Sequence, residues 1–288
     1  MRFNTPLRYP GGKGKLTDFI RLVFEQNKLA DGHYVEPYAG GAGIALSLLF
    51  LEYASHIHLN DINKSVYAFW RSVLKHTDEL CRLIYDSKVT MSEWYRQKAV
   101  QDNPSHYSLL ELGFSTFFLN RSNRSGIIRA GAIGGKNQDG KWKLDARFNK
   151  PDLILRIKKI SLYSDRISLH NLDADKLIHE IIPTLPDKTL VYLDPPYYVK
   201  GEGLYENHYV HADHVRVSRL VKTQIKHKYW IVSYDDTPEI HVLYKKYRKI
   251  VYGLNYSAQN RHSGSEVMFF SPHLVIPDVS NPAKLKTA

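Results

Sequence analysis

The sequence of 288 residues has a single cysteine, Cys81, and no apolar run near the roughly 20 residues that cross a bilayer. One thiol cannot form an intramolecular disulfide, nor a zinc site built on paired thiolates. The first residues also lack the apolar segment of a signal peptide. We therefore expect a cytoplasmic protein that does not associate with membranes.

Acidic residues are scarce relative to basic ones. There are 29 of them against 40, which gives a formal net charge of +11 and a pI of about 9.4. Basic surfaces gain affinity for polyanions because they release counterions from phosphates. Eight basic and only two acidic residues lie between positions 121 and 150. This concentration favours a nucleic-acid partner, although basic proteins without that role exist.

The residues that carry the most chemical information are Asp194-Pro195-Pro196-Tyr197. Residues 190–193 predict a short buried strand, which must stop here because proline has no N–H for the ladder. In an open α/β sheet, a polar group at this end of a strand faces the crevice where ligands bind. The Asp194 carboxylate and the Pro195 carbonyl could accept from an amino group while Tyr197 stacks on its ring. The alternative is an exposed aspartate before a proline turn.

Two further predicted strands lead into polar or glycine-rich segments. Residues 33–36 precede a turn that contains Gly40 and Gly43, and residues 57–59 precede Asp61. A strand, a glycine-rich turn and a helix are typical of the first unit of a nucleotide-binding α/β fold. The glycine spacing differs from the dinucleotide fingerprint, and a negative charge on Glu36 would repel a pyrophosphate. The pattern favours a cationic or uncharged nucleoside cofactor.

Other strand ends and turns offer weaker signals. Residues 167–170 predict a strand that leads to Asp173, either a cofactor contact or a helix cap. Lys13 follows two glycines and could contact an anion, or belong to a flexible basic turn. Residues 229–233, 249–252 and 266–270 predict three more strands, the last two antiparallel at the sheet edge. His211 and His214 with Asp213 fit caps and surface residues better than a metal site, so we expect no metal.

Residues 85–150 interrupt the α/β pattern and predict an inserted target-recognition subdomain with a basic loop. Residues 1–84 and 151–276 would form the catalytic, cofactor-binding domain, and residues 277–288 a flexible tail. Asparagine and arginine side chains suit adenine and guanine edges, although they could equally contact phosphates only. The candidate DNA-binding residues are Asn120, Arg121, Asn123, Arg124, Arg129 and Lys136.

Together these segments resemble the S-adenosylmethionine-dependent DNA adenine-N6 methyltransferase family, in its Dam-like subgroup. The resemblance covers the chain from Tyr9 to about Phe270. It rests on five segments in the family's order: Tyr9-Pro10-Gly11-Gly12-Lys13, Glu36-Pro37-Tyr38-Ala39-Gly40-Gly41-Ala42-Gly43, Asn60-Asp61-Ile62-Asn63, Asn120-Arg121 with Ser125-Gly126, and Asp194-Pro195-Pro196-Tyr197.

The resemblance implies a Rossmann-like fold: a doubly wound, mostly parallel sheet with an antiparallel edge pair and an inserted recognition subdomain. It implies methyl transfer from S-adenosylmethionine to adenine N6 in double-stranded DNA, after the base is flipped out. The catalytic residues would be Asp194, Pro195 and Tyr197. The implied cofactor contacts are Tyr9, Lys13, Glu36, Gly40, Gly43, Asp61, Asp173 and Asp194, although Ala174-Asp175 departs from the family's usual Asp-x-Phe.

Two alternatives remain at this point. One is a methyltransferase that acts on another amine, such as cytosine N4, RNA adenine or a protein side-chain amide. The other is a DNA-binding relative that has lost catalysis, against which the presence of Lys13, Asp61 and Asp194 argues. We expect the protein to act as a monomer on DNA, and a cognate restriction endonuclease is a candidate partner.

Overall fold

The computed structural model describes residues 4–8, 13–199, 209–255 and 263–285. The chain forms two compact units, each with its own internal contacts. The helical unit comprises Met1–Gly12 and Asn63–Asp165, and the sheet unit comprises Lys13–Ile62 and Arg166–Ala288. In the described part of the chain, no helix combines the length and the apolar character needed to span a membrane.

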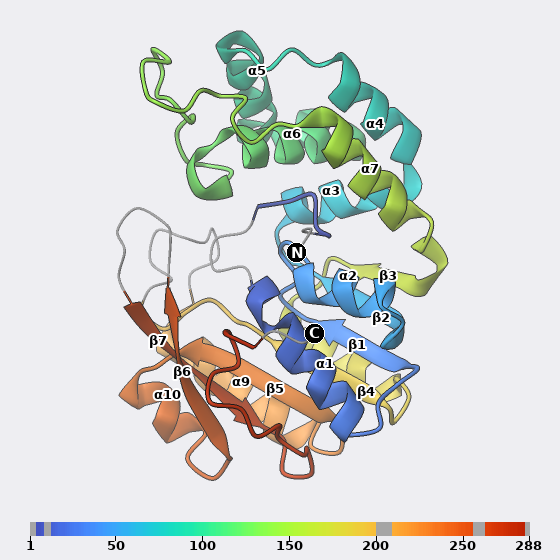
Figure 1. The fold of residues 1–288 in the computed structure, drawn as a ribbon, viewed down its shortest axis with the longest axis vertical. Coiled ribbons are helices and arrows are strands. Elements are labelled where there is room, and N and C mark those ends of the chain that lie inside the picture. Colours follow the sequence, from blue (N-terminus) through green and yellow to red (C-terminus); the bar gives the residue numbers. More distant parts are fainter. Residues whose placement is uncertain (1–3, 9–12, 200–208, 256–262, 286–288) are drawn as a thin grey trace. The chain divides into compact units, whose positions relative to one another are not determined.

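The sheet unit contains one seven-stranded sheet with the strand order β3-β2-β1-β4-β5-β7-β6 (Figure 1). Strands β1 to β5 run parallel to one another, whereas β7 is antiparallel to both β5 and β6. This confirms the expected doubly wound sheet with an antiparallel edge. The strands are β1 Gly32–Glu36, β2 Ala54–Asn60, β3 Ile167–His170, β4 Thr189–Leu193, β5 Tyr229–Asp235, β6 Lys249–Asn255 and β7 Ser263–Phe270.

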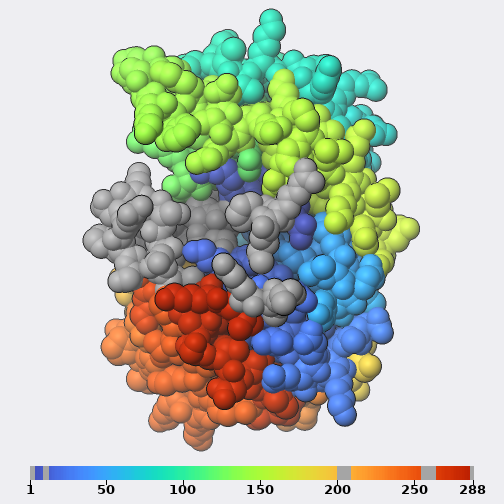
Figure 2. All heavy atoms as spheres, in the orientation of Figure 1, coloured from blue at the N-terminus to red at the C-terminus, as the bar shows by residue number. Residues whose placement is uncertain are grey.

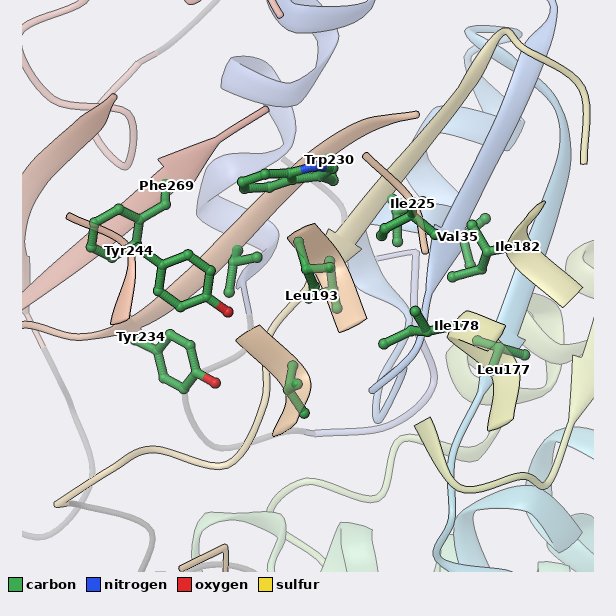
Figure 3. Packing of buried hydrophobic residues seen from close by; sticks show 14 of the residues in the cluster. Val35, Leu177, Ile178, Ile182, Leu193, Ile225, Trp230, Tyr234, Tyr244 and Phe269 are labelled. Carbon is green, nitrogen blue, oxygen red and sulfur yellow. The ribbon is translucent and has the colours of Figure 1, made fainter. Parts of the chain in front are cut away.

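Helices cover both faces of this sheet. Residues 177–182 and the helices α9 (His211–Thr223) and α10 (Pro238–Leu243) pack on one face, whose core includes Trp230, Tyr244 and Phe269 (Figure 3). On the other face, Phe19 of α1 (Thr17–Gln26) lies edge-on to Phe270. All five residues of β4 are buried, as expected for a central parallel strand covered on both sides. The helix α2 (Gly43–Phe50) packs against β1 and β2.

The helical unit is built mainly from five helices: α3 Lys64–Lys75, α4 Thr77–Asp86, α5 Met91–Asp102, α6 Leu109–Ser122 and α7 Lys150–Ser161. The starts of α3, α5, α6 and α7 carry side-chain caps from Asn63, Thr90, Ser108 and Asn149. Helices α3 and α6 pack closely at Gly113. A Cβ added at this residue would lie only 2.6 Å from the carbonyl oxygen of Ala68.

The helical unit differs from the sequence prediction in two ways. The helical spacing of apolar residues over 65–83 predicts one helix, but this stretch forms two helices, α3 and α4, which meet at His76. Residues 85–150, expected as a separate subdomain, lie within a larger unit that also contains α3 and α7. Asn149 followed by Pro151 predicts a helix start, and α7 does begin here, with the Asn149 side chain accepting from the Asp152 N–H.

Candidate active site in the sheet unit

Acidic residues lie at one end of neighbouring parallel strands. Glu36 ends β1, Asp61 follows β2 and Asp194 follows β4. Since β1 pairs in parallel with both β2 and β4, these strand ends meet at the same edge of the sheet. The chain changes winding direction between β1 and β4, which is where open α/β sheets bind their ligands.

Asp194 is the most exposed member of a buried polar network, with 23% of its side chain accessible. Its Oδ1 accepts from the Ser233 hydroxyl at 2.8 Å, and Ser233 Oγ lies 2.9 Å from the Tyr192 hydroxyl. Among the described residues, Oδ2 has no hydrogen-bond partner. One oxygen of this carboxylate is therefore held in place, and the other remains available as an acceptor.

Behind Asp194, the Lys13 ammonium joins two carboxylates. Its Nζ lies 2.7 Å from Glu266 Oε2 and 3.4 Å from Asp194 Oδ1. It also donates to the Tyr197 hydroxyl at 2.7 Å, and Tyr197 in turn donates to Glu266 Oε1. The Tyr252 hydroxyl donates to Glu266 Oε2 at 2.7 Å. Residues from the first and last sixths of the sequence thus meet the Asp-Pro-Pro-Tyr segment.

The electrostatics of this network follow from its burial. Burial, with a smaller contribution from the charge of Glu266, raises the pKa of Asp194 to about 6, although Lys13 and Ser233 oppose the rise. Burial alone would lower the pKa of Lys13, but the attraction of Asp194 and Glu266 outweighs it, so that pKa is raised. The lysine is therefore an ammonium, and with both carboxylates ionised the three groups carry one net negative charge.

The structure corrects the argument made from the charge of Glu36. Its side chain is buried, and burial raises its pKa to about 8, although an N–H donated by Ala45 at 3.2 Å opposes the shift. Glu36 is therefore mostly protonated at neutral pH. The sequence could not reveal this, because the shift depends on how α2 and the sheet enclose the carboxyl group.

The glycine-rich turn after β1 is tied to the end of β2. Gly40 N–H donates to Asp61 Oδ2 at 3.0 Å, and Ala39 N–H donates to the Asn60 carbonyl at 2.8 Å. Gly40 and Ala42 have φ values of 47° and 49°, the left-handed region that lets the chain turn sharply into α2. The glycine-rich turn and Asp61 are thus held together by hydrogen bonds at the edge of the sheet where Glu36 and Asp194 also lie.

The remaining sequence candidates in this region have different placements. Tyr9 lies outside the described residues. Asp173 is exposed and caps α8 (Ala174–Lys176) through the Asp175 N–H at 2.9 Å, which was the alternative to a cofactor contact. Tyr197 is only 4% exposed, and its hydroxyl is part of the Lys13 network. Its ring is therefore not open for stacking in this conformation.

Glu266 is the residue that sequence reasoning missed. It lies on β7 with no exposed surface and accepts from Lys13, Tyr197 and Tyr252. The sequence held one weak signal, a glutamate directly before the apolar residues Val267-Met268-Phe269-Phe270 of a predicted strand. Nothing local indicated that it would pair with a lysine 253 positions earlier.

In the helical unit, two of the candidate DNA-binding residues are engaged internally. Asn120 accepts from the Arg8 N–H and donates to the Arg8 and Gly126 carbonyls. Asn123 accepts from Trp94 Nε1 at 2.6 Å and donates to the carbonyls of residues 127 and 128. Both amides are buried. This placement gives both side-chain amides structural hydrogen bonds within the helical unit.

The basic candidates differ from one another. Arg121 is half-buried and donates to the Arg147 carbonyl at 2.7 Å; burial lowers its pKa to about 10. Arg124, Arg129 and Lys136 are exposed. Residues 127–149, which connect α6 to α7, lie at the surface of the helical unit (green to yellow-green in Figure 2). This loop is the basic surface that the sequence composition predicted.

The strand order and the acidic strand ends define a Rossmann-like methyltransferase fold. The chain belongs to the D12 class N6 adenine-specific DNA methyltransferase family, whose family model matches residues 9–258. Methyltransferases of this kind generally use S-adenosylmethionine. The family that the sequence motifs resembled is therefore confirmed.

Similarity to solved structures is remote. A candidate RNA methyltransferase from Pyrococcus horikoshii has a TM-score of 0.42 and 9% identity, with 92% of this chain and 86% of that chain covered. A protein from Legionella pneumophila has a TM-score of 0.32 and 10% identity, with 89% and 84% covered. A sequence search of curated proteins gave no significant match.

Proposed function

We propose that this protein transfers a methyl group from S-adenosylmethionine to the exocyclic N6 of adenine in double-stranded DNA. The observation that carries the proposal is the Asp194 carboxylate. It stands at the carboxyl end of β4, before Pro195 and Pro196, with one oxygen fixed by Ser233 and the other available. That arrangement suits an acceptor for an amino group placed in the crevice.

The residues also fit the cofactor. With both carboxylates ionised, the network of Lys13, Asp194 and Glu266 has one uncompensated negative charge. Such a site favours a cationic ligand over a pyrophosphate. Lys13, Gly40, Asp61 and Asp194 would hold the cofactor, which supplies an activated methyl group on a sulfonium.

Adenine N6 is a poor nucleophile because its lone pair is delocalised into the ring. Asp194 Oδ2 and the Pro195 carbonyl would accept hydrogen bonds from its amino group and make that lone pair more available. Asp194 performs this role when ionised, and its pKa of about 6 means that it is mostly ionised at neutral pH. The contribution of these groups is positioning and electrostatic stabilisation.

Double-stranded DNA is the proposed substrate because the helical unit exposes Arg124, Arg129 and Lys136 in a loop rich in basic residues. Adenine N6 lies inside the duplex, so the base must be flipped out at a cost of a few kcal/mol. Because Tyr197 is buried here, stacking on the flipped base would require its ring to become exposed. Cytosine N4 and RNA adenine remain alternative substrates for the same amine chemistry.

The test is methyl transfer from labelled S-adenosylmethionine to unmethylated genomic DNA, followed by nucleoside analysis. We expect label in N6-methyladenine, and a fall on the order of 100-fold or more in kcat for Asp194→Asn, which keeps the shape but removes the charged acceptor. Asp187→Asn, at an exposed position just before the same strand, is the matched control and should leave kcat unchanged. Label in another nucleoside, or normal turnover by Asp194→Asn, would contradict the proposal.

A further inference from the structure

Glu266 is a fully buried carboxylate on an antiparallel strand, remote in sequence from every motif of the active site. It sits opposite Asp235 of β5 and Tyr252 of β6 in the sheet. Burying a carboxylate is unfavourable unless it is paired and hydrogen-bonded. Donors among the described residues that compensate the burial include the Lys13 ammonium and the hydroxyls of Tyr197 and Tyr252.

The distances show which carboxylate holds the lysine. Lys13 Nζ is 2.7 Å from Glu266 Oε2, a full hydrogen bond, but 3.4 Å from Asp194 Oδ1. Glu266 therefore draws the ammonium toward itself. Without Glu266, the nearest carboxylate left for Lys13 would be Asp194. A closer ion pair at Oδ1 would neutralise part of the negative charge with which Oδ2 accepts from the substrate amine.

We propose that Glu266 is a positioning residue for methyl transfer. It takes the shorter ion pair with Lys13, fixes the Tyr197 hydroxyl, and so leaves Asp194 free to accept from the target amine. This inference rests on the function proposed above for Asp194.

A consequence for pH follows from the charges around Asp194. Among the described residues, the groups that face it are Lys13, Glu266 on β7 and Ser233 on β5, with Tyr192, Glu36 and Tyr252 acting on the same buried region. Glu266 raises the pKa of Asp194, and Lys13 lowers it. A neutral residue in place of Glu266 would no longer raise the pKa of Asp194. Lys13, freed from Glu266, would lower that pKa more strongly, so the pKa of Asp194 falls.

The experiment compares the wild-type protein with Glu266→Gln and Glu266→Asp. In kcat/KM for DNA methylation, the acidic limb should move to lower pH in Glu266→Gln, while the plateau falls on the order of tenfold because Lys13 now competes for Asp194. Glu266→Asp keeps the charge, so its acidic limb should stay nearer to the wild-type position. A purely structural role would lower stability without moving the limb.

A second readout tests whether Glu266 acts through the lysine. If it does, Glu266→Gln should reduce activity much less in a Lys13→Met background than in the wild type. Equal losses in both backgrounds, or an unmoved acidic limb with a normal plateau, would overturn the proposal.

Two further measurements keep the proposal separable from folding and from the proposed function. Carbon-13 NMR of the Asp194 carboxyl, assigned with Asp194→Asn, reads its titration without turnover; a titration unchanged by Glu266→Gln would overturn the inference even if the substrate were not DNA. If Glu266→Gln fails to fold, Tyr252→Phe removes one donor and leaves the charge. In the Tyr252→Phe protein, the titration of the Asp194 carboxyl should move to higher pH. A shift of that titration to lower pH would refute the role of Glu266.

Discussion

Four histidines on strands β1, β2 and β3 should make the protein sensitive to mild acid. His33 of β1, His56 and His58 of β2, and His170 of β3 form a histidine cluster, with centroid distances of 4.9–6.1 Å between neighbouring rings. His33 Nδ1 lies 3.1 Å from His58 Nε2. His58 is 6% exposed, and in the described structure its Nδ1 is buried without a hydrogen-bond partner.

The expected loss of stability in mild acid follows from the pKa of His58. Burial, together with the nearby His56, His33 and His170, lowers the pKa of His58 from 6.5 to about 3. The unfolded chain therefore binds more protons than the folded protein between these two values, and stability falls as the pH drops below 6.5. Between pH 7.5 and pH 5, His58 alone should reduce the free energy of unfolding by about 2 kcal/mol.

Urea unfolding followed by circular dichroism at pH 7.5 and pH 5 would measure this loss. His58→Phe keeps an aromatic ring but cannot be protonated, so it should lose about 2 kcal/mol less than the wild type over the same interval. His227→Phe is the control, since His227 is exposed in the same unit. If His58→Phe and the wild type lost stability equally, the cluster would not be the cause of the acid sensitivity.

Two further predictions concern the helical unit. Replacing Arg124, Arg129 and Lys136 together by alanine should weaken DNA binding mainly at low salt, and each phosphate that is no longer neutralised should reduce the slope of log K against log salt concentration by about 0.9. Fluorescence anisotropy on duplex DNA over a salt series measures the slope, and an unchanged slope would place the DNA-binding surface elsewhere. Gly126→Ala should destabilise the unit by at least about 1 kcal/mol, because φ at this residue is +78° and the new Cβ would lie 2.5 Å from the Arg8 carbonyl oxygen. Thermal unfolding that stays at the wild-type temperature would refute this reading of the turn.

The strands and their order along the chain could be predicted because the relevant signals are local. The run before Asp194 is apolar or β-favouring at every position, and the prolines after it cannot continue a ladder. The helix start at Asn149 was equally predictable from a cap followed by proline and spaced apolar residues. The helix break at His76 was not, since the apolar spacing continues through it.

Asn120 and Asn123 show which contacts of a candidate site the sequence could not reveal. An asparagine near arginines in a basic segment suits a base edge, and the local sequence gave no competing use for its amide. The competing partners come from elsewhere: Arg8 lies 112 positions away from Asn120, and Trp94 lies 29 positions away from Asn123. Only the folded helical unit brings these groups together.

The sequence by itself determined the sheet, the acidic strand ends and the Asp-Pro-Pro-Tyr segment, since each depends on neighbouring residues. Tertiary structure decided which buried polar groups pair and which titratable groups are charged at neutral pH. The Lys13–Glu266 ion pair spans 253 positions, and the neutral state of Glu36 depends on the packing that removes water from it. Burial and long-range pairing set these properties, and neither is encoded in any short stretch of the chain.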